Sequence, residues 1–278
     1  MKRFFCALLT CAAMLVGCVD DDSDFATRPD GSDSSSSVKP NSSAATPKSS
    51  GSSDVSEAPV KPCKTEKKDN CKYGKVTDKR DGQTYKTVVI GDQTWMAQNM
   101  NLETEESFCY NDSDETCSPD GRFYTWADAM DGKGRWSDDG KGCGENSTCS
   151  ARYPIRGICP EGWHLPSKEE FKILVESLGG IDGAGDSLKS TSGWEEYDGF
   201  YKRSGNGTDA YGFGALPLGY VLFGNLTLTG FYVNYWSATE CGKDCVYQLA
   251  LYYYSGSASV ENAYSKQGYA FPVRCVKD

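Results

Sequence analysis

The sequence has little histidine and no excess of positive charge. His164 is the only histidine among 278 residues, and no two cysteines follow the spacing Cys-x-x-Cys. Structural zinc sites use such cysteine pairs together with histidine, so we do not expect a zinc site. The net charge at pH 7 is -10 and the pI is near 4.8. We identify no basic patch, which argues against nucleic acid and anionic membrane surfaces as partners.

The chain also lacks an apolar run long enough to cross a bilayer. Its most apolar stretch, residues 4–16, follows Lys2 and Arg3 and leads into Leu-Val-Gly-Cys at residues 15–18. This arrangement is typical of a secretory signal, and the tetrapeptide resembles a bacterial lipobox. The sequence predicts a signal peptide over residues 1–17 and lipidation of Cys18, which would anchor the protein in the outer membrane, facing the cell surface. An ordinary secretory signal with a chance cysteine is the alternative.

Residues 18–62 contain few of the apolar side chains that a core requires. They are rich in serine, aspartate, proline, threonine and lysine, as in the run SDSSSSVKPNSSAATPKSSGSSD. Such segments do not bury enough surface to offset the entropy of ordering. We therefore expect a disordered tether over residues 18–62 and a folded domain over residues 63–278.

Cysteine is abundant in the folded part. Thirteen cysteines are present, and removing Cys6, Cys11 and Cys18 with the signal and the lipid leaves ten. An even number outside the cytoplasm indicates disulfides. Sequence alone does not fix their connectivity, but proximity suggests four short loops and leaves one pair to close a long loop: Cys63–Cys71, Cys109–Cys117, Cys143–Cys149, Cys241–Cys245 and Cys159–Cys275.

Two helices have local signals. Ser167 and Glu170 form a capping box before apolar residues at 171, 174, 175 and 178, which predicts a helix of about eleven residues. Thr125 can cap a second, short helix. The glycine-rich stretch 179–193 is expected to be loop, and short strands are bounded by turns such as Asp81-Gly82. The predicted fold class is α+β, with few short helices, short antiparallel strands and many loops held by disulfides.

Three stretches occur in the order YTWADAM (124–130), CPEGWHLPSKEEFKIL (159–174) and FPVRCV (271–276). They resemble the two helices and the final cysteine-bearing strand of C-type lectin-like domains. In that fold the cysteine before the second helix pairs with the one in the last strand. The resemblance therefore implies the same pairing for Cys159 and Cys275, and a C-type lectin-like fold.

A larger set of stretches covers about residues 74–277: TDKRDGQTYKTVVIGDQTWMAQNMNL, CYNDSDETC, GRFYTWADAM, CPEGWHLPSKEEF, GTDAYGFGALPLGY, YWSATE and VRCVKD. Together they resemble the Fibrobacter succinogenes major paralogous (FISUMP) domain. Members of that family are typically secreted or lipid-anchored. The resemblance implies no activity that can be transferred to this chain.

Residues that could carry catalysis are present but scattered. His164 follows Trp163 and precedes Leu165, which places it on the solvent side of a short strand as part of the scaffold. A glycan-processing enzyme would need two carboxylates about 5–10 Å apart. Asp209, Glu195 and Glu240 are the candidates, and we favour a solvated surface role for them.

A calcium site would use oxygen ligands, which residues 110–121 (YNDSDETCSPDG) supply in number. The stretch lacks the spacing of an EF-hand. The triplets Glu-Pro-Asn and Gln-Pro-Asp of sugar-binding C-type lectins do not occur either. We therefore expect no cofactor, with a structural calcium as the alternative.

Aromatic residues are the last candidate for a site. The stretches GFYVNYW and LYYYSG can present rings on a strand face, and exposed rings stack on the apolar faces of sugars. We expect a non-catalytic domain that binds polysaccharide or an envelope protein. A structural or protein-interaction module and a carboxylate-based glycan-processing enzyme are the alternatives. The candidate ligand-binding residues are Trp194, Tyr197, Trp236, Tyr252, Tyr254 and Asp209.

Overall fold

The computed structural model describes residues 58–109, 113–200 and 202–278. The predicted signal peptide, Cys18 and most of the predicted tether (18–62) lie outside the described residues. Contacts with the domain begin before the predicted boundary at residue 63, because the amide of Val60 donates to the carbonyl of Ser177 over 2.8 Å. None of the helices in the described part of the chain is long and apolar enough to cross a membrane.

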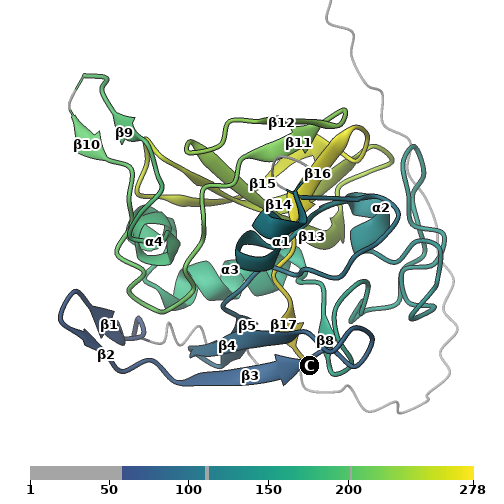
Figure 1. Ribbon diagram of the computed structural model, residues 1–278, viewed down its shortest axis with the longest axis horizontal. Coiled ribbons are helices and arrows are strands. Elements are labelled where there is room, and N and C mark those ends of the chain that lie inside the picture. Colours follow the sequence, from purple (N-terminus) through teal and green to yellow (C-terminus); the bar gives the residue numbers. More distant parts are fainter. Residues whose placement is uncertain (1–57, 110–112, 201) are drawn as a thin grey trace, which may run out of the picture. The chain divides into compact units, whose positions relative to one another are not determined.

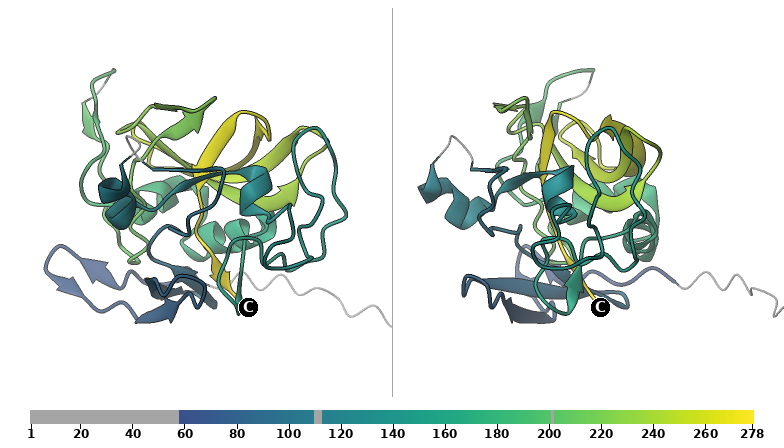
Figure 2. Two further views of the ribbon diagram at one scale, coloured as in Figure 1. Left: turned by 45° about the vertical axis from the view of Figure 1, so that its right-hand side comes forward. Right: turned by 90° about the vertical axis from the view of Figure 1, so that its right-hand side faces the viewer.

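The first strands form an antiparallel layer at the bottom of every view (Figures 1 and 2). A short hairpin of β1 (Lys64–Thr65) and β2 (Lys68–Asp69) precedes a five-stranded sheet in the order β3-β4-β5-β17-β8. The predicted Asp81-Gly82 turn lies between β3 and β4, with Gly82 at a φ of 77°. The members of the sheet are β3 (Tyr73–Thr77), β4 (Thr84–Ile90), β5 (Gln93–Met96), β8 (Trp163–His164) and β17 (Val276–Lys277).

Two further antiparallel sheets lie above this layer in Figure 1. One has the order β12-β11-β16-β7-β6 and the other the order β13-β14-β15. A separate hairpin of β9 (Glu196–Tyr197) and β10 (Arg203–Ser204) projects at the top. The remaining strands are β6 (Ser107–Phe108), β7 (Phe123–Thr125), β11 (Tyr220–Leu222), β12 (Asn225–Thr227), β13 (Tyr232–Glu240), β14 (Cys245–Tyr252), β15 (Ala258–Ser265) and β16 (Tyr269–Pro272).

Both predicted helices are confirmed. In α3 (Lys168–Ser177) the side chain of Ser167 accepts from the amide of Glu170, and the Glu170 carboxylate accepts from the amide of Ser167. Phe171, Leu174 and Val175 are the buried face that the apolar spacing predicts. In α2 (Trp126–Ala129) the Thr125 hydroxyl accepts from the amide of Asp128 over 3.2 Å.

The expectation that residues 179–193 form only loop is wrong. Residues 181–188 form α4 (Ile181–Leu188), which is kinked at Asp182 and Gly183. Ala184 and Leu188 are fully buried, so tertiary packing outweighs the low helix propensity of glycine. The structure also contains a helix that the sequence did not predict, α1 (Asp114–Asp120). It follows Cys109, the first cysteine of the Cys109–Cys117 disulfide.

Two large hydrophobic clusters fill the space between the sheets and helices. In one, the rings of Trp95 and Phe171 are stacked with centroids 5.5 Å apart, which joins the lower sheet to α3. In the other, Trp236 packs on Phe271 with centroids 4.1 Å apart. The core therefore depends on large aromatic side chains that join distant parts of the chain.

A guanidinium is buried inside this core. Arg274 is 1% exposed, and its guanidinium donates to the side-chain oxygen of Asn99 and to the backbone carbonyls of Met96, Phe213 and Gly214. All these acceptors are neutral. Burial lowers the pKa of Arg274, and the hydrogen bonds compensate for its lost hydration.

The disulfides follow the pairing that proximity suggested. Four close short loops, and Cys159–Cys275 joins residues 116 positions apart. The described part of the chain is therefore mostly β-strand and loop, with few short helices and five disulfides.

Candidate functional site

Six aromatic side chains meet where β13 begins, where β14 ends and where β9 passes beside them. We call this group the tyrosine cluster, and its members are Tyr197, Phe231, Tyr232, Tyr252, Tyr253 and Tyr254. The cluster arises from strand register, because Tyr232 and Tyr252 are direct partners across β13 and β14. Every ring is at least partly exposed, so the cluster forms part of the surface.

The ring geometry leaves an outer face for a ligand. Tyr254 is 43% exposed, and its ring is stacked on that of Tyr252 with centroids 5.3 Å apart and planes 25° apart. Tyr232 meets Tyr252 edge-on at 5.3 Å, and Tyr197 meets Tyr253 edge-on at 5.8 Å. Edge-on contacts hold the inner rings in place, so the outer ring keeps a defined orientation.

Lys189, at the C-terminal end of α4, supports the cluster from behind. Its ammonium is buried and donates to the carbonyls of Tyr252 and Ser255, at 3.2 and 3.1 Å, and lies 2.9 Å from the carboxylate of Asp186. Burial lowers the pKa of Lys189 more strongly than Asp186 raises it. The turn that carries the rings of Tyr252 and Tyr254 is therefore fixed by a buried charge.

Asp186 also fixes the hairpin that carries Tyr197. Arg203 of β10 donates from one nitrogen to both carboxylate oxygens of Asp186, at 2.8 and 2.7 Å. Gly185 allows the backbone of α4 to lie close to that of Ser257, since a Cβ at this position would lie 2.3 Å from the Ser257 carbonyl oxygen. The helix, the turn and the hairpin are thus packed together at one point.

The edge of the cluster is acidic. Glu195, Glu196 and Asp198 flank Tyr197 in sequence and are exposed, whereas Lys202 is the exposed cation of the same hairpin. Three carboxylates against one ammonium disfavour a polyanion at this edge. Carboxylates accept hydrogen bonds from hydroxyl groups, so the edge suits a neutral, hydroxylated ligand.

The two candidate tryptophans are not at this surface, which corrects the sequence interpretation. Trp194 is 5% exposed, and its indole N–H donates to the Ser190 hydroxyl and the Ala215 carbonyl. Trp236 is fully buried, and its N–H donates to the carbonyl of Tyr124 over 2.7 Å. Both rings fill the core, so neither can stack on a ligand.

Asp209 is likewise structural. Its carboxylate forms an ion pair with Lys64 and accepts from the amide of Gly214 over 2.7 Å. It is 8% exposed and adopts a positive φ of 47° in a loop. Of the six candidate residues, Tyr197, Tyr252 and Tyr254 lie together, and Phe231, Tyr232 and Tyr253 are the members that we did not single out from the sequence.

His164 is buried, at 6% exposed, rather than on the solvent side of its strand. One ring nitrogen lies 2.6 Å from the Glu170 carboxylate and the other 2.7 Å from that of Asp278. Burial would lower the pKa of His164, but the hydrogen bonds to the two carboxylates raise it above its ordinary value. The histidine thus joins α3 to the end of β17 as an imidazolium between two anions.

The other carboxylates considered for catalysis are separated or occupied. Glu240 forms an ion pair with the buried Lys266 and accepts from the amide of Cys149 over 3.1 Å. Glu195 is exposed at the edge of the tyrosine cluster. Residues 110–112 of the calcium candidate lie outside the description, and 114–120 form α1. Among the described residues no group of three or more His, Cys, Asp or Glu side chains could hold a metal ion.

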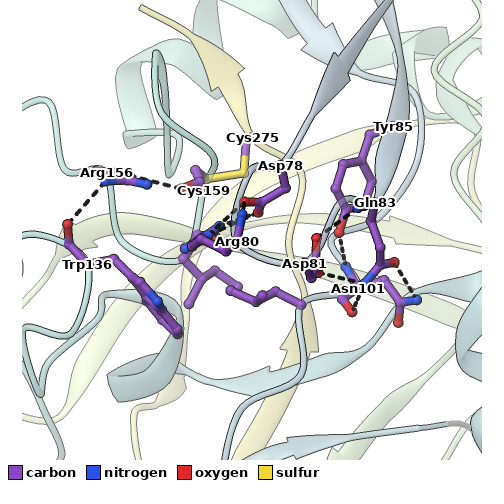
Figure 3. Close-up of polar contacts among 12 residues, drawn as sticks. Asp78, Arg80, Asp81, Gln83, Tyr85, Asn101, Trp136, Arg156, Cys159 and Cys275 are labelled. Carbon is purple, nitrogen blue, oxygen red and sulfur yellow. Dashed lines mark hydrogen bonds and ion pairs between the residues drawn. A yellow bond between two sulfur atoms is a disulfide. The ribbon is translucent and has the colours of Figure 1, made fainter.

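Figure 3 shows a polar network between the β3–β4 turn and the loop before β8. Arg80 donates to both carboxylate oxygens of Asp78 and to the carbonyl of Ile158, and its guanidinium lies 4.8 Å from the Trp136 ring centroid. Burial would raise the pKa of Asp78, but its hydrogen bonds with Arg80 lower it. The charge of Arg80 is thus neutralised within the fold, and we assign this network to stability.

Beside that network a second polar set lines a hollow of about 440 Å³ (Figure 3). Gln83 donates to Asp81 and to the carbonyl of Asn101, and the Asn101 side chain donates to Gln83. The Tyr85 hydroxyl accepts from the amide of Asn101 over 3.1 Å. These bonds connect β4 to the chain after β5, again within the fold.

Residues 88–277 match the family model of the Fibrobacter succinogenes major domain. The match covers more than half of the chain, and the protein therefore belongs to this family. No curated protein and no solved structure shows a significant match. The tyrosine cluster and four of the five disulfides lie within the matched residues, whereas Cys63–Cys71, Asp78 and Arg80 precede them.

Proposed function

We propose that this protein is a lipid-anchored envelope protein of the outer membrane whose domain binds a neutral polysaccharide without catalysis. The tyrosine cluster carries the proposal. It presents a partly exposed, oriented aromatic surface that is held from behind by Lys189 and Asp186. Rigid aromatic rings at a surface are the usual platform for the apolar faces of sugar rings.

Two observations support the choice of a neutral polymer over an anionic one. The exposed carboxylates of Glu195, Glu196 and Asp198 surround Tyr197 and would repel a polyanion. The nearby Arg203 is already paired with Asp186, and Lys189 is buried. The hydroxyl groups of a neutral sugar can donate to the carboxylates while its ring packs on Tyr254.

A non-catalytic role is supported by how the other carboxylates are used. Asp209 and Glu240 are both paired with lysine side chains within the fold. We also propose a C-type lectin-like fold, supported by the Cys159–Cys275 disulfide, which connects the segment before α3 to the chain between β16 and β17.

The test is retention of the full chain, with its disulfides formed, on insoluble neutral polysaccharides such as cellulose, xylan, mannan and chitin. We expect retention on at least one polymer, and its loss in Tyr254→Ala and Tyr252→Ala. Phe223→Ala is the matched control, because Phe223 is 73% exposed and lies in the β11–β12 turn outside the cluster.

The melting temperature of each variant would confirm that the fold is intact. A repeat in EDTA tests the calcium alternative. Failure of the wild type to bind any neutral polymer would overturn the polysaccharide proposal. Equal loss in Phe223→Ala would show that the cluster is not the site.

A further inference from the structure

The charge of the domain is divided sharply along the chain. Residues 58–90 carry nine lysines and arginines against four aspartates and glutamates, a net charge of +5. Residues 91–278 carry fifteen against twenty-seven, a net charge of -12. The acidic total of the whole chain concealed this basic segment, so our sequence interpretation that no basic patch exists was wrong.

The basic residues lie on the β1–β4 layer, at the bottom of Figures 1 and 2, whereas the β9–β10 hairpin lies at the top of every view. Two lysines of the segment form ion pairs, Lys64 with Asp209 and Lys79 with Glu161. The others are exposed and form no ion pair with any described residue. We call them the lysine face: Lys61, Lys67, Lys68, Lys72, Lys75 and Lys86.

A hollow of about 490 Å³ lies within this face. It is lined by residues of two paired strands and of the chain after β5, which are Tyr73, Gly74, Lys75, Thr84, Lys86 and Gln98. The Gln98 side-chain oxygen accepts from the amide of Lys86 over 2.6 Å, so its amide nitrogen is the end that can donate to a ligand. The hollow thus combines two ammonium groups with a hydroxyl and an amide.

Lys75 and Lys86 are direct partners in the β3–β4 register. Like charges directly opposite each other on neighbouring strands destabilise a sheet. Lys86 gains from a cation–π contact, with its nitrogen 3.4 Å from the centroid of the Tyr73 ring, but Lys75 forms no such contact among the described residues. An anion between the two ammonium groups would remove the repulsion.

We propose that the lysine face binds an acidic polysaccharide, with a carboxylate of the polymer between Lys75 and Lys86 in the hollow. The site is separate from the tyrosine cluster and does not depend on the function proposed for it. The further exposed lysines of the same segment, Lys61, Lys67, Lys68 and Lys72, add positive charge, as a polymer with repeated charges requires.

The hollow decides between an acidic glycan and an anionic lipid surface. Attraction to an anionic lipid surface needs only clustered basic side chains, whereas Lys75 and Lys86 flank a concave site that also holds hydrogen-bond donors. Thr84 and Gln98 can bond the hydroxyl groups that surround a carboxylate on a sugar ring. The chemistry therefore fits a uronic-acid polymer.

The test is binding of the full chain to soluble polygalacturonate, measured by biolayer interferometry. The highly methyl-esterified form of this polymer is the control, because it has the same backbone with its carboxylates neutralised. We expect binding to polygalacturonate only, weakening steeply as NaCl rises from about 50 to about 500 mM. The double variant Lys75→Gln/Lys86→Gln should bind about tenfold more weakly.

The matched control is Lys243→Gln/Lys277→Gln, which removes the same charge at two exposed lysines outside the face. It should bind as the wild type does. The control should keep the wild-type melting temperature, because both of its replaced side chains are exposed. Lys75→Gln/Lys86→Gln should melt at the same temperature or slightly higher, because it removes a like-charged cross-strand pair.

Equal binding by the two double variants would overturn the proposal, and so would equal binding to the esterified polymer. Binding to vesicles containing about 30% phosphatidylglycerol, with none to polygalacturonate, would assign the face to a lipid surface instead. Retention on neutral polymers, lost in Tyr254→Ala, is a separate readout, so failure at one site leaves the other assignment unaffected.

Discussion

The tyrosine cluster and the lysine face differ in what holds them in place. Behind the tyrosine cluster, a buried lysine donates to two backbone carbonyls and an aspartate ties in a neighbouring hairpin. The lysine face has exposed ammonium groups on β3 and β4, at Lys75 and Lys86, and on the β1–β2 hairpin, which the Cys63–Cys71 disulfide closes. Lysine thus has two different roles: the buried ammonium of Lys189 bonds to groups within the fold, whereas the exposed ammonium of Lys75 remains accessible to solvent or a ligand.

This difference predicts two modes of recognition. A rigid aromatic surface selects by shape and apolar contact, which salt affects little. Exposed lysines act through charge, which salt screens over about 10 Å at 0.1 M ionic strength. Raising the ionic strength should therefore weaken binding at the lysine face and change binding at the tyrosine cluster little.

The largest expected effect comes from Lys189→Met. The carbonyls of Tyr252 and Ser255 would lose their buried donor, at a cost of about 2–4 kcal/mol in the free energy of unfolding. Retention on neutral polysaccharide should fall, while binding to polygalacturonate persists. Urea unfolding measures the first effect. Lys172→Met, at a partly exposed lysine that pairs with Glu169 on the same helix, should change stability by less than about 0.5 kcal/mol.

Next in size is the double variant Cys63→Ser/Cys71→Ser. Opening this short loop should cost about 2–3 kcal/mol in the chain-entropy account. It should also weaken polygalacturonate binding, because the hairpin with Lys67 and Lys68 loses its closure. Cys143→Ser/Cys149→Ser opens a loop of similar length elsewhere. Thermal unfolding should show a similar loss there, and an equal loss of polygalacturonate binding in this control would contradict the assignment.

A third prediction concerns His164 and the stability of the whole domain. Because the folded pKa of His164 is raised, its stabilisation is complete below about pH 6.5. It is lost as the pH rises through the folded value. The free energy of unfolding should thus decline above pH 6.5 in the wild type, and less in His164→Gln.

A single histidine makes this directly measurable, because one imidazole resonance titrates in the proton NMR spectrum. The titration should lie above 6.5, owing to Glu170 and Asp278. Asp139, Arg156 and Glu161 line the same small hollow and contribute to the local field. A midpoint at or below 6.5 would contradict the imidazolium assignment.

The smallest effect should come from Lys75→Glu. Replacing a like-charged cross-strand pair with an opposite-charged one should stabilise the sheet by about 0.2–1 kcal/mol. The same change should abolish polygalacturonate binding. A rise in melting temperature with loss of binding would sharpen the contrast, because it shows a residue kept at some cost to stability. Lys243→Glu, outside the face, should leave polygalacturonate binding unchanged.

Local signals in the sequence predicted the parts of the fold that local chemistry determines. The capping box of Ser167 and Glu170 located α3, and short spacings between cysteines predicted their pairing. Helix α4 was missed because its formation depends on burying Ala184 and Leu188 against distant strands. No property of its glycine-rich sequence indicates that burial.

The site was predicted in part for a similar reason. Six consecutive residues of β13, from Val233 to Ala238, are buried, so alternation of side chains does not distinguish an outer face. Trp236 could thus not be separated from Tyr232 by pattern. The lysine face was missed because charge was summed over the whole chain, whereas a window over residues 61–75 would have revealed six lysines against two acidic residues.

Arg274 has a consequence for the order in which the protein can be completed during synthesis. Its acceptors belong to segments made much earlier, since Asn99 precedes it by 175 positions and Phe213 by 61. Until residue 274 has left the ribosome, those oxygens have no cation to bind and the centre of the core remains open. A nascent chain that stops short of this residue should therefore stay sensitive to proteases, which would remove unfinished copies.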